Sequence, residues 1–116
     1  MKPQFTDKVA VITGASSGIG RATAVQFAGA GAQVIVSDIN EDGGEETVRL
    51  IRELGGDATF VQTDVADSTS VDRMVEFTLA TYGRLDIGVN NAGIGGTWAK
   101  TAEYPREDWD QVLAVN

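Results

Sequence analysis

The stretch Thr13-Gly14-Ala15-Ser16-Ser17-Gly18-Ile19-Gly20 follows the apolar run 9–12 and precedes residues 21–30, a helix-like segment rich in small side chains. A strand that turns into a helix through glycines can bring its backbone close to a ligand, because glycine has no side chain in the way. The first turn of a helix also offers N–H groups without intrahelical partners and a partial positive charge. The stretch therefore predicts a phosphate-binding turn between a strand and a helix.

The glycines of this turn are spaced as G-x-x-x-G-x-G, which differs from the dinucleotide pattern G-x-G-x-x-G. The turn is not a P-loop either, because Arg21 follows the last glycine and no Lys-Ser/Thr pair comes after it. We expect Gly14 to release the strand into a tight turn, Gly18 to admit a pyrophosphate, and Gly20 to let the helix pack closely on the sheet. The alternative is a glycine-rich turn that binds no ligand.

Outside this turn, short apolar runs alternate with longer segments of helical period, a pattern typical of an α/β protein with a parallel sheet. The predicted strands span residues 8–13, 33–37, 58–62 and 85–90. The predicted helices end near residue 29, span 41–54, run from Asp67 or Ser68 to Gly83, and begin again near Pro105. No linker or repeat interrupts the alternation, so residues 1–116 are predicted to form one domain.

The composition excludes several classes of function. A formal net charge of −8 disfavours nucleic acid and an anionic membrane surface as partners. The chain has no Cys, and its lack of His as well excludes a Cys/His zinc site and a Ser-His-Asp triad within it, so no metal site is predicted. No apolar run has the length of a membrane span and residues 1–7 lack a signal-peptide core, so we expect a cytoplasmic protein.

Asp38 lies just past the second predicted strand, 18 residues beyond Gly20. A carboxylate at this position can accept hydrogen bonds from a ribose 2′-hydroxyl and would repel a 2′-phosphate. No Lys or Arg occurs in residues 39–48, and Ser17 rather than a basic residue precedes Gly18. These features favour NAD over NADP. The alternative is that Asp38 only caps the following helix.

Three further polar groups are candidates for the same site. Asp64 follows the third predicted strand and could accept from an adenine amino group while Val65 packs on the ring; alternatively it is a loop residue near a helix cap. Asn90-Asn91-Ala92-Gly93 ends the fourth strand, where buried amides need partners, so they could join strand ends, hold a ribose or form a simple turn. Asn116 is either an amide on an apolar helix face or an exposed terminal residue.

Taken in this order, the motifs resemble the short-chain dehydrogenase/reductase family, from about Lys8 to Asn116. The resemblance implies a doubly wound Rossmann fold with strand order 3-2-1-4 that binds NAD(H) or NADP(H). It assigns cofactor contacts to the pyrophosphate loop, the ribose acid, the adenine pocket and the end of the fourth strand: Gly14, Ser16, Ser17, Gly18, Ile19, Gly20, Asp38, Asp64, Val65, Asn91, Ala92 and Gly93. Asn116 matches the family's catalytic asparagine, which orders a water and lysine proton relay.

The chain departs from the family because the catalytic Ser and the Tyr-x-x-x-Lys pair do not occur in it. Neither Tyr82 nor Tyr104 has a Lys four residues later. We therefore expect the chain to carry the cofactor half of an oxidoreductase that moves hydride between NAD and an alcohol or carbonyl substrate, to end within the helix after strand four, and to be inactive alone. The alternative is a non-catalytic NAD-binding or structural module, acting alone or with a partner chain.

An exposed fourth strand and bare apolar surface would also favour self-association.

Overall fold

The structure is a computed structural model that describes residues 4–91. It contains β1 (Val9–Thr13), α1 (Gly18–Gly29), β2 (Gln33–Asp38), α2 (Glu41–Glu53), β3 (Asp57–Gln62), α3 (Ser68–Tyr82) and β4 (Ile87–Val89). The predicted elements in this range are confirmed, with boundaries that differ by one or two residues. The helix predicted near Pro105 lies outside the described residues. Within residues 4–91, none of the helices combines the length and apolar character that a membrane crossing requires.

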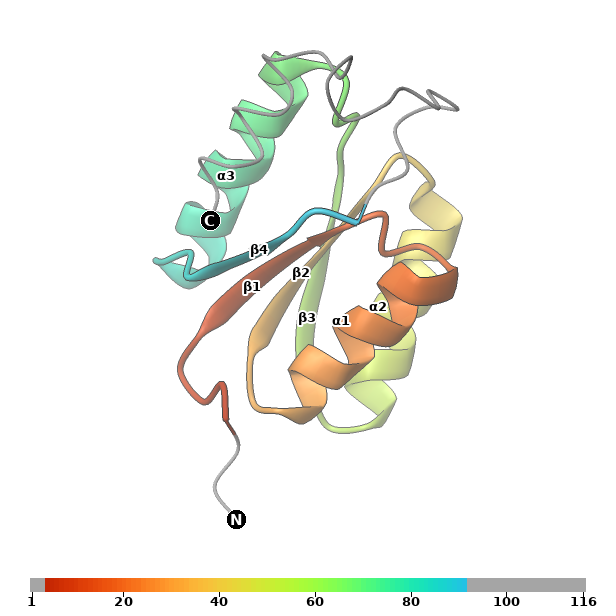
Figure 1. Ribbon diagram of the computed structural model, residues 1–116, viewed down its shortest axis with the longest axis vertical. Coiled ribbons are helices and arrows are strands. Elements are labelled where there is room, and N and C mark those ends of the chain that lie inside the picture. Colours follow the sequence, from red (N-terminus) through yellow and green to blue (C-terminus); the bar gives the residue numbers. More distant parts are fainter. Residues whose placement is uncertain (1–3, 92–116) are drawn as a thin grey trace.

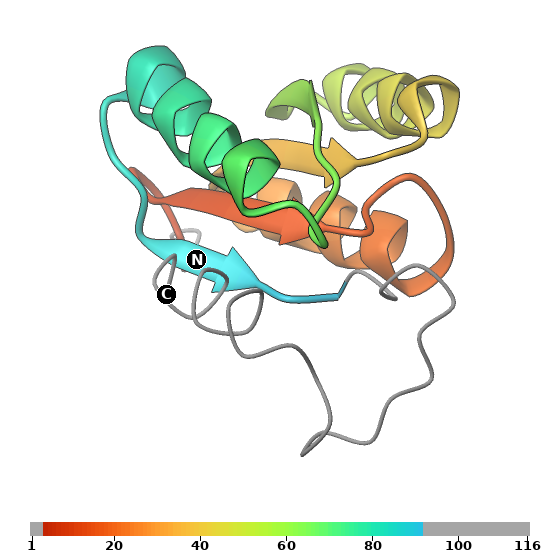
Figure 2. The ribbon, with the colours of Figure 1, turned by 90° about the horizontal axis from the view of Figure 1, so that it is seen from above.

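All strand pairs are parallel, and the sheet order is β3-β2-β1-β4, as the resemblance implied. Val11 in β1 lies opposite Ile35 in β2 and Gly88 in β4. Because each crossover is right-handed, the helices of the two connections that run outward from β1 through β2 to β3 lie on one face of the sheet. The helix of the connection that returns past β1 to β4 lies on the other face. Accordingly, α1 and α2 cover one face and α3 covers the other (Figure 1, Figure 2).

The sheet is buried on both faces, which explains why the segment 9–12 is apolar without alternation. Every residue of β1 is buried. Ala10 and Ile12 belong to the cluster formed with α1 and α2, whereas Val11 belongs to the cluster formed with α3. The helices contribute Ala24, Val48 and Ile51 to the first cluster and Val71 and Met74 to the second.

The three helix starts differ in a way that bears on the site. Asn40 caps α2 by accepting a hydrogen bond from the Gly43 N–H, and Asp67 caps α3 by accepting one from the Thr69 N–H. Ser17, the N-cap residue of α1, makes no side-chain capping bond. The N–H groups of the first turn of α1 are therefore left for another acceptor.

Candidate functional site

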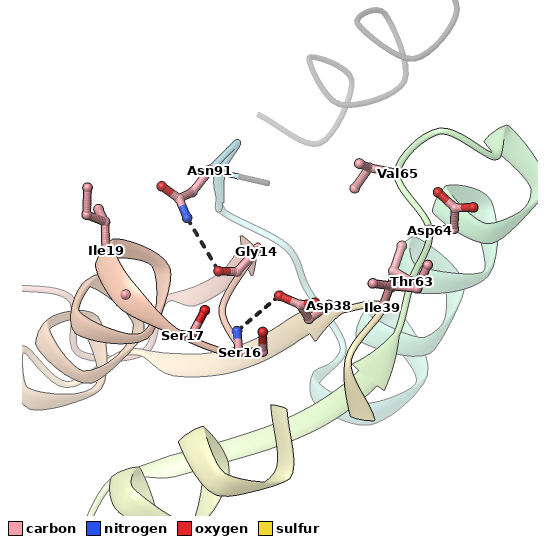
Figure 3. Close-up of a pocket in the computed structure, with 11 residues that line it drawn as sticks. Gly14, Ser16, Ser17, Ile19, Asp38, Ile39, Thr63, Asp64, Val65 and Asn91 are labelled. Atoms are coloured by element: carbon pink, nitrogen blue, oxygen red, sulfur yellow. Dashed lines mark hydrogen bonds between the residues drawn. The ribbon is translucent and has the colours of Figure 1, made fainter. Parts of the chain in front are cut away.

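A cavity of about 540 Å³ opens along the edge where the carboxyl ends of the four strands meet (Figure 3). Its lining residues are Gly14, Ser16, Ser17, Gly18, Ile19, Asp38, Ile39, Thr63, Asp64, Val65 and Asn91. The described residues that the sequence predicts as cofactor contacts all line this cavity, apart from Gly20, which is buried and is not among the lining residues. Ala92, Gly93 and Asn116 lie outside the described residues.

The glycine turn has the geometry expected of its three glycines. Gly14 and Gly18 have φ values of 65° and 55°, in the left-handed region that other residues rarely adopt. A Cβ on Gly20 would overlap the carbonyl oxygen of Gly14 and lie 2.6 Å from the Asn91 Nδ2. Nothing lies within 4 Å of the position of a Cβ on Gly18. Gly20 therefore allows close packing, and Gly18 leaves open space beside the backbone.

The first turn of α1 forms one wall of the cavity. Ser17, Gly18 and Ile19 are exposed and line it, and the side chain of Ile19 is 78% exposed. Because α1 lacks a side-chain cap, its N-terminal N–H groups and the positive end of its dipole are available to an anion in the cavity.

Asp38 lies between this turn and the end of β3 (Figure 3). Its Oδ2 accepts a hydrogen bond from the Ser16 N–H at 3.1 Å, and its Oδ1 accepts one from the Asn40 N–H at 2.9 Å. The interpretation of Asp38 as the cap of α2 is wrong, because Asn40 provides that cap. A carboxylate oxygen has two lone pairs, so each oxygen of Asp38 can accept a further bond from a ligand.

The ends of β3 and β4 supply the rest of the lining. The Asp64 carboxylate accepts from the Ala66 N–H at 2.9 Å, and Val65 is 8% exposed. Asn91 donates its backbone N–H to the Thr13 Oγ1 at 3.1 Å and its Nδ2 to the Gly14 carbonyl oxygen at 3.4 Å. Asn91 thus joins the ends of β1 and β4, which is one of the roles proposed for the amides at the end of the fourth strand.

Sequence reasoning missed two lining residues, Ile39 and Thr63. Ile39 is 63% exposed and adds apolar surface to the cavity. Thr63 is buried and donates its N–H to the Asp38 carbonyl oxygen at 2.9 Å. Their positions in the sequence could have indicated them, since Ile39 follows Asp38 and Thr63 precedes Asp64.

The resolved pKa shifts belong to groups away from the cavity. The Arg84 guanidinium and the Val9 N–H lower the pKa of Asp86, and burial raises the pKa of the Tyr82 hydroxyl. Among residues 4–91, no group of three or more His, Cys, Asp and Glu side chains could hold a metal ion. The residues that line the cavity offer a ligand hydrogen-bond donors, acceptors and apolar surface.

These features define the class of protein. A parallel sheet whose strand order reverses beside β1, with a glycine turn and an open cavity at the carboxyl ends of its strands, is a dinucleotide-binding α/β fold. The family model described as short chain dehydrogenase matches residues 8–116. The chain belongs to this family.

Curated relatives agree with that assignment. An uncharacterized oxidoreductase of Thermotoga maritima is 49% identical over 112 residues, which cover 97% of this chain and 43% of the relative. A cyclohexanol dehydrogenase of an Acinetobacter species is 42% identical over 116 residues, which cover 100% of this chain and 46% of the relative. The chain thus spans less than half the length of these two relatives.

Solved structures give the same picture. A crystal structure of a hydroxysteroid dehydrogenase from Escherichia coli matches with a TM-score of 0.84 and 35% identity, covering 98% of this chain and 52% of that chain. A 7α-hydroxysteroid dehydrogenase complexed with NADH and 7-oxo glycochenodeoxycholic acid also matches with a TM-score of 0.84, at 34% identity, covering 98% of this chain and 48% of that chain.

Proposed function

We propose that the cavity binds NAD(H) and that the whole protein transfers hydride between this cofactor and an alcohol or carbonyl substrate. The observation that carries the proposal is the uncapped start of α1, which opens on the same cavity as the Asp38 carboxylate. The turn at the start of α1 thus suits a pyrophosphate, and the Asp38 carboxylate beside it suits a ribose. These two groups are also adjacent in a dinucleotide.

The pyrophosphate would lie against the turn formed by Ser16, Ser17, Gly18 and Ile19. The open space beside Gly18 permits close approach to the backbone, and the peptide dipoles of α1 provide favourable charge without a basic side chain. The net charge of −8 is therefore compatible with an anionic cofactor.

The preference for NAD rests on Asp38. Its carboxylate would accept from the 2′-hydroxyl of the adenosine ribose, whereas a 2′-phosphate would place like charges together. The lining residues next to it are Ile39 and Thr63, which carry no positive charge to offset this repulsion. The adenine ring would lie between the exposed side chain of Ile39 and Val65, with Asp64 accepting from its amino group.

The nicotinamide ring, when bound, supplies a carbon that accepts or gives a hydride. Oxidation of an alcohol to a carbonyl compound would use this hydride acceptor together with a base that takes up the hydroxyl proton. Names of relatives support this chemistry, since they include cyclohexanol and hydroxysteroid dehydrogenases. We propose that Asn91, Ala92 and Gly93 line the path of the cofactor and that Asn116 belongs to the proton relay.

Calorimetric titration with NAD and NADP tests the cofactor assignment. We expect the wild type to bind NAD more tightly than NADP. Asp38→Asn should lower the affinity for NAD about tenfold or more, because a charged acceptor is lost, whereas the affinity for NADP should fall less or rise. Asp72→Asn, which neutralises an exposed carboxylate on α3, should change neither affinity. Binding of neither dinucleotide would contradict the proposal; NAD binding by the full-length protein without alcohol or ketone turnover would instead favour the non-catalytic module.

A further inference from the structure

Arg21 lies in the first turn of α1, yet its side chain turns away from solvent toward the start of α2. Its Nη2 donates to the Ser16 carbonyl oxygen at 2.5 Å and to the Gly43 carbonyl oxygen at 3.2 Å, and its Nε donates to the Thr47 Oγ1 at 2.9 Å. Arg21 does not line the cavity. One guanidinium therefore ties together the glycine turn and two residues of α2.

Thr47 continues this network toward the turn. It is fully buried in α2, and its hydroxyl donates to the Ala15 carbonyl oxygen at 2.7 Å, which is closer than the second acceptor, the Gly43 carbonyl oxygen at 3.2 Å. The N–H of that same peptide group belongs to Ser16 and is donated to the Asp38 carboxylate. Because a peptide group is planar, holding its oxygen also fixes the direction of its N–H. Thr47 thus helps to fix the N–H group that orients Asp38.

Arg21 acts on the next peptide group in the same way. By binding the Ser16 carbonyl oxygen it fixes the plane of the peptide whose N–H belongs to Ser17, which lines the cavity at the start of α1. Close packing supports the arrangement, since a Cβ on Gly43 would lie 2.8 Å from the Ser16 Cβ. Two successive peptides of the turn are therefore held from α2.

We infer that Arg21 and Thr47 are positioning residues for cofactor binding, an inference that rests on the proposed function of the cavity. Arg21 sets the peptide that faces the pyrophosphate, and Thr47 sets the peptide that orients the ribose acid. Neither side chain touches the cofactor. The two residues differ in effect: the pyrophosphate is common to NAD and NADP, whereas Asp38 distinguishes them.

The test is the affinity of the full-length protein for NAD and NADP in four variants and one control. Arg21→Met removes the guanidinium, and Arg21→Lys keeps the charge without the planar group that reaches three acceptors. Thr47→Val removes the hydroxyl and leaves a side chain of similar volume, whereas Thr47→Ser keeps the hydroxyl. The matched control is Arg52→Met, because Arg52 also donates to a carbonyl oxygen, that of Ala58 at 3.0 Å, but lies at the far end of α2 from the cavity.

Arg21→Met is expected to weaken NAD and NADP by the same factor, about tenfold to a hundredfold, and Arg21→Lys should not restore binding fully. Thr47→Val is expected to lower the affinity for NAD more than the affinity for NADP, which reduces the preference for NAD. Thr47→Ser should keep the wild-type preference. Arg52→Met should bind both dinucleotides as the wild type does. A general loss of folding would not change the NAD-to-NADP ratio, so for Thr47 this ratio separates positioning from stability. For Arg21 the separation comes from urea unfolding, in which Arg21→Met should be as stable as Arg52→Met although only Arg21→Met binds both dinucleotides more weakly.

Wild-type affinity in Arg21→Met, full function in Arg21→Lys, or an equal loss in Arg52→Met would overturn the inference and leave the proposed function intact. An unchanged NAD-to-NADP ratio in Thr47→Val would overturn the role of Thr47. A wild-type protein that binds neither dinucleotide would overturn the proposed function and, with it, the positioning role.

Discussion

At Gly20 the space between α1 and the preceding turn is too small for any side chain. The residue does not line the cavity, but the Gly14 carbonyl oxygen and the Asn91 amide close in on it, and both of those residues are lining residues. A methyl group at this point must move the start of α1, the turn or the end of β4. The contact couples the packing of a helix to the shape of the cavity.

Gly20→Ala should therefore lower the free energy of unfolding by about 1–3 kcal/mol, the usual cost of overpacking, and also weaken NAD. Gly29→Ala is the matched control in the same helix, because nothing lies within 4 Å of a Cβ there. It should be neutral or stabilising by up to about 1 kcal/mol. Denaturant unfolding measures the change in stability, and NAD titration measures the change in affinity. A Gly20→Ala protein as stable as the wild type would show that the turn can shift to accommodate a methyl group at little energetic cost.

Single residues also mark how far sequence reasoning reaches. The conformations of Gly14 and Gly18 could be predicted because a strand-to-helix turn requires them locally. The contacts of Arg21 with Thr47 could not, because 26 residues separate the pair and only the packing of α1 against α2 brings them together. Ile39 was missed for a related reason: an aliphatic residue beside a strand predicts burial, and its exposure depends on the shape of the cavity.

At the level of elements, a side chain adds to the backbone hydrogen bonding between β1 and the residue before β4. The Asp86 Oδ2 accepts a hydrogen bond from the Val9 N–H at 2.8 Å, and the Asp86 N–H donates to the Val9 carbonyl oxygen at 2.9 Å. Arg84 pairs with the same carboxylate at 2.7 Å. β4 (Ile87–Val89) is shorter at both ends than the predicted span 85–90. The other element boundaries were predictable from glycines and capping residues, which act locally.

The Asp86 contacts predict a pH dependence of stability. Its pKa is lowered from 3.8, chiefly by Arg84 and then by the Val9 N–H, so the folded state favours the charged form. The stabilisation is therefore present above pH 3.8 and is lost as the pH falls through the lower pKa of the folded state. The difference in unfolding free energy between the wild type and Asp86→Asn should be largest near about pH 7 and shrink below about pH 4.

Urea unfolding of both proteins across this range measures the difference, and other acids cancel in the comparison. Asp72→Asn is the control, since Asp72 is an exposed carboxylate on α3. A difference for Asp86→Asn that stayed constant with pH would show that the carboxylate gains nothing from Arg84 and Val9.

At the level of the whole molecule, β4 forms one edge of the sheet that residues 4–91 build. Within residues 4–91, β4 pairs only with β1, and its three residues are partly exposed. An unpaired strand edge can hydrogen-bond to a strand of another chain. The strand order followed from the family resemblance and agrees with the right-handed crossover rule, but what covers this edge is a property of the assembled protein that local patterns do not encode.

We expect the 116-residue chain, produced by itself, to self-associate. Light scattering should then report a mass that is a multiple of 12.2 kDa and that rises with concentration. A monodisperse species at 12.2 kDa over the same concentrations would contradict this expectation.

The position of β1 in the middle of the sheet has a consequence for the order of folding. Its pairing with β2 needs only the helix between them, whereas its contacts with β4 join groups 77 residues apart, such as Val9 and Asp86. Closing so long a loop costs more chain entropy than closing the short one. During synthesis, β1, β2 and their helix can therefore assemble early, while the opposite side of β1 stays without its partner until residue 89 has been made.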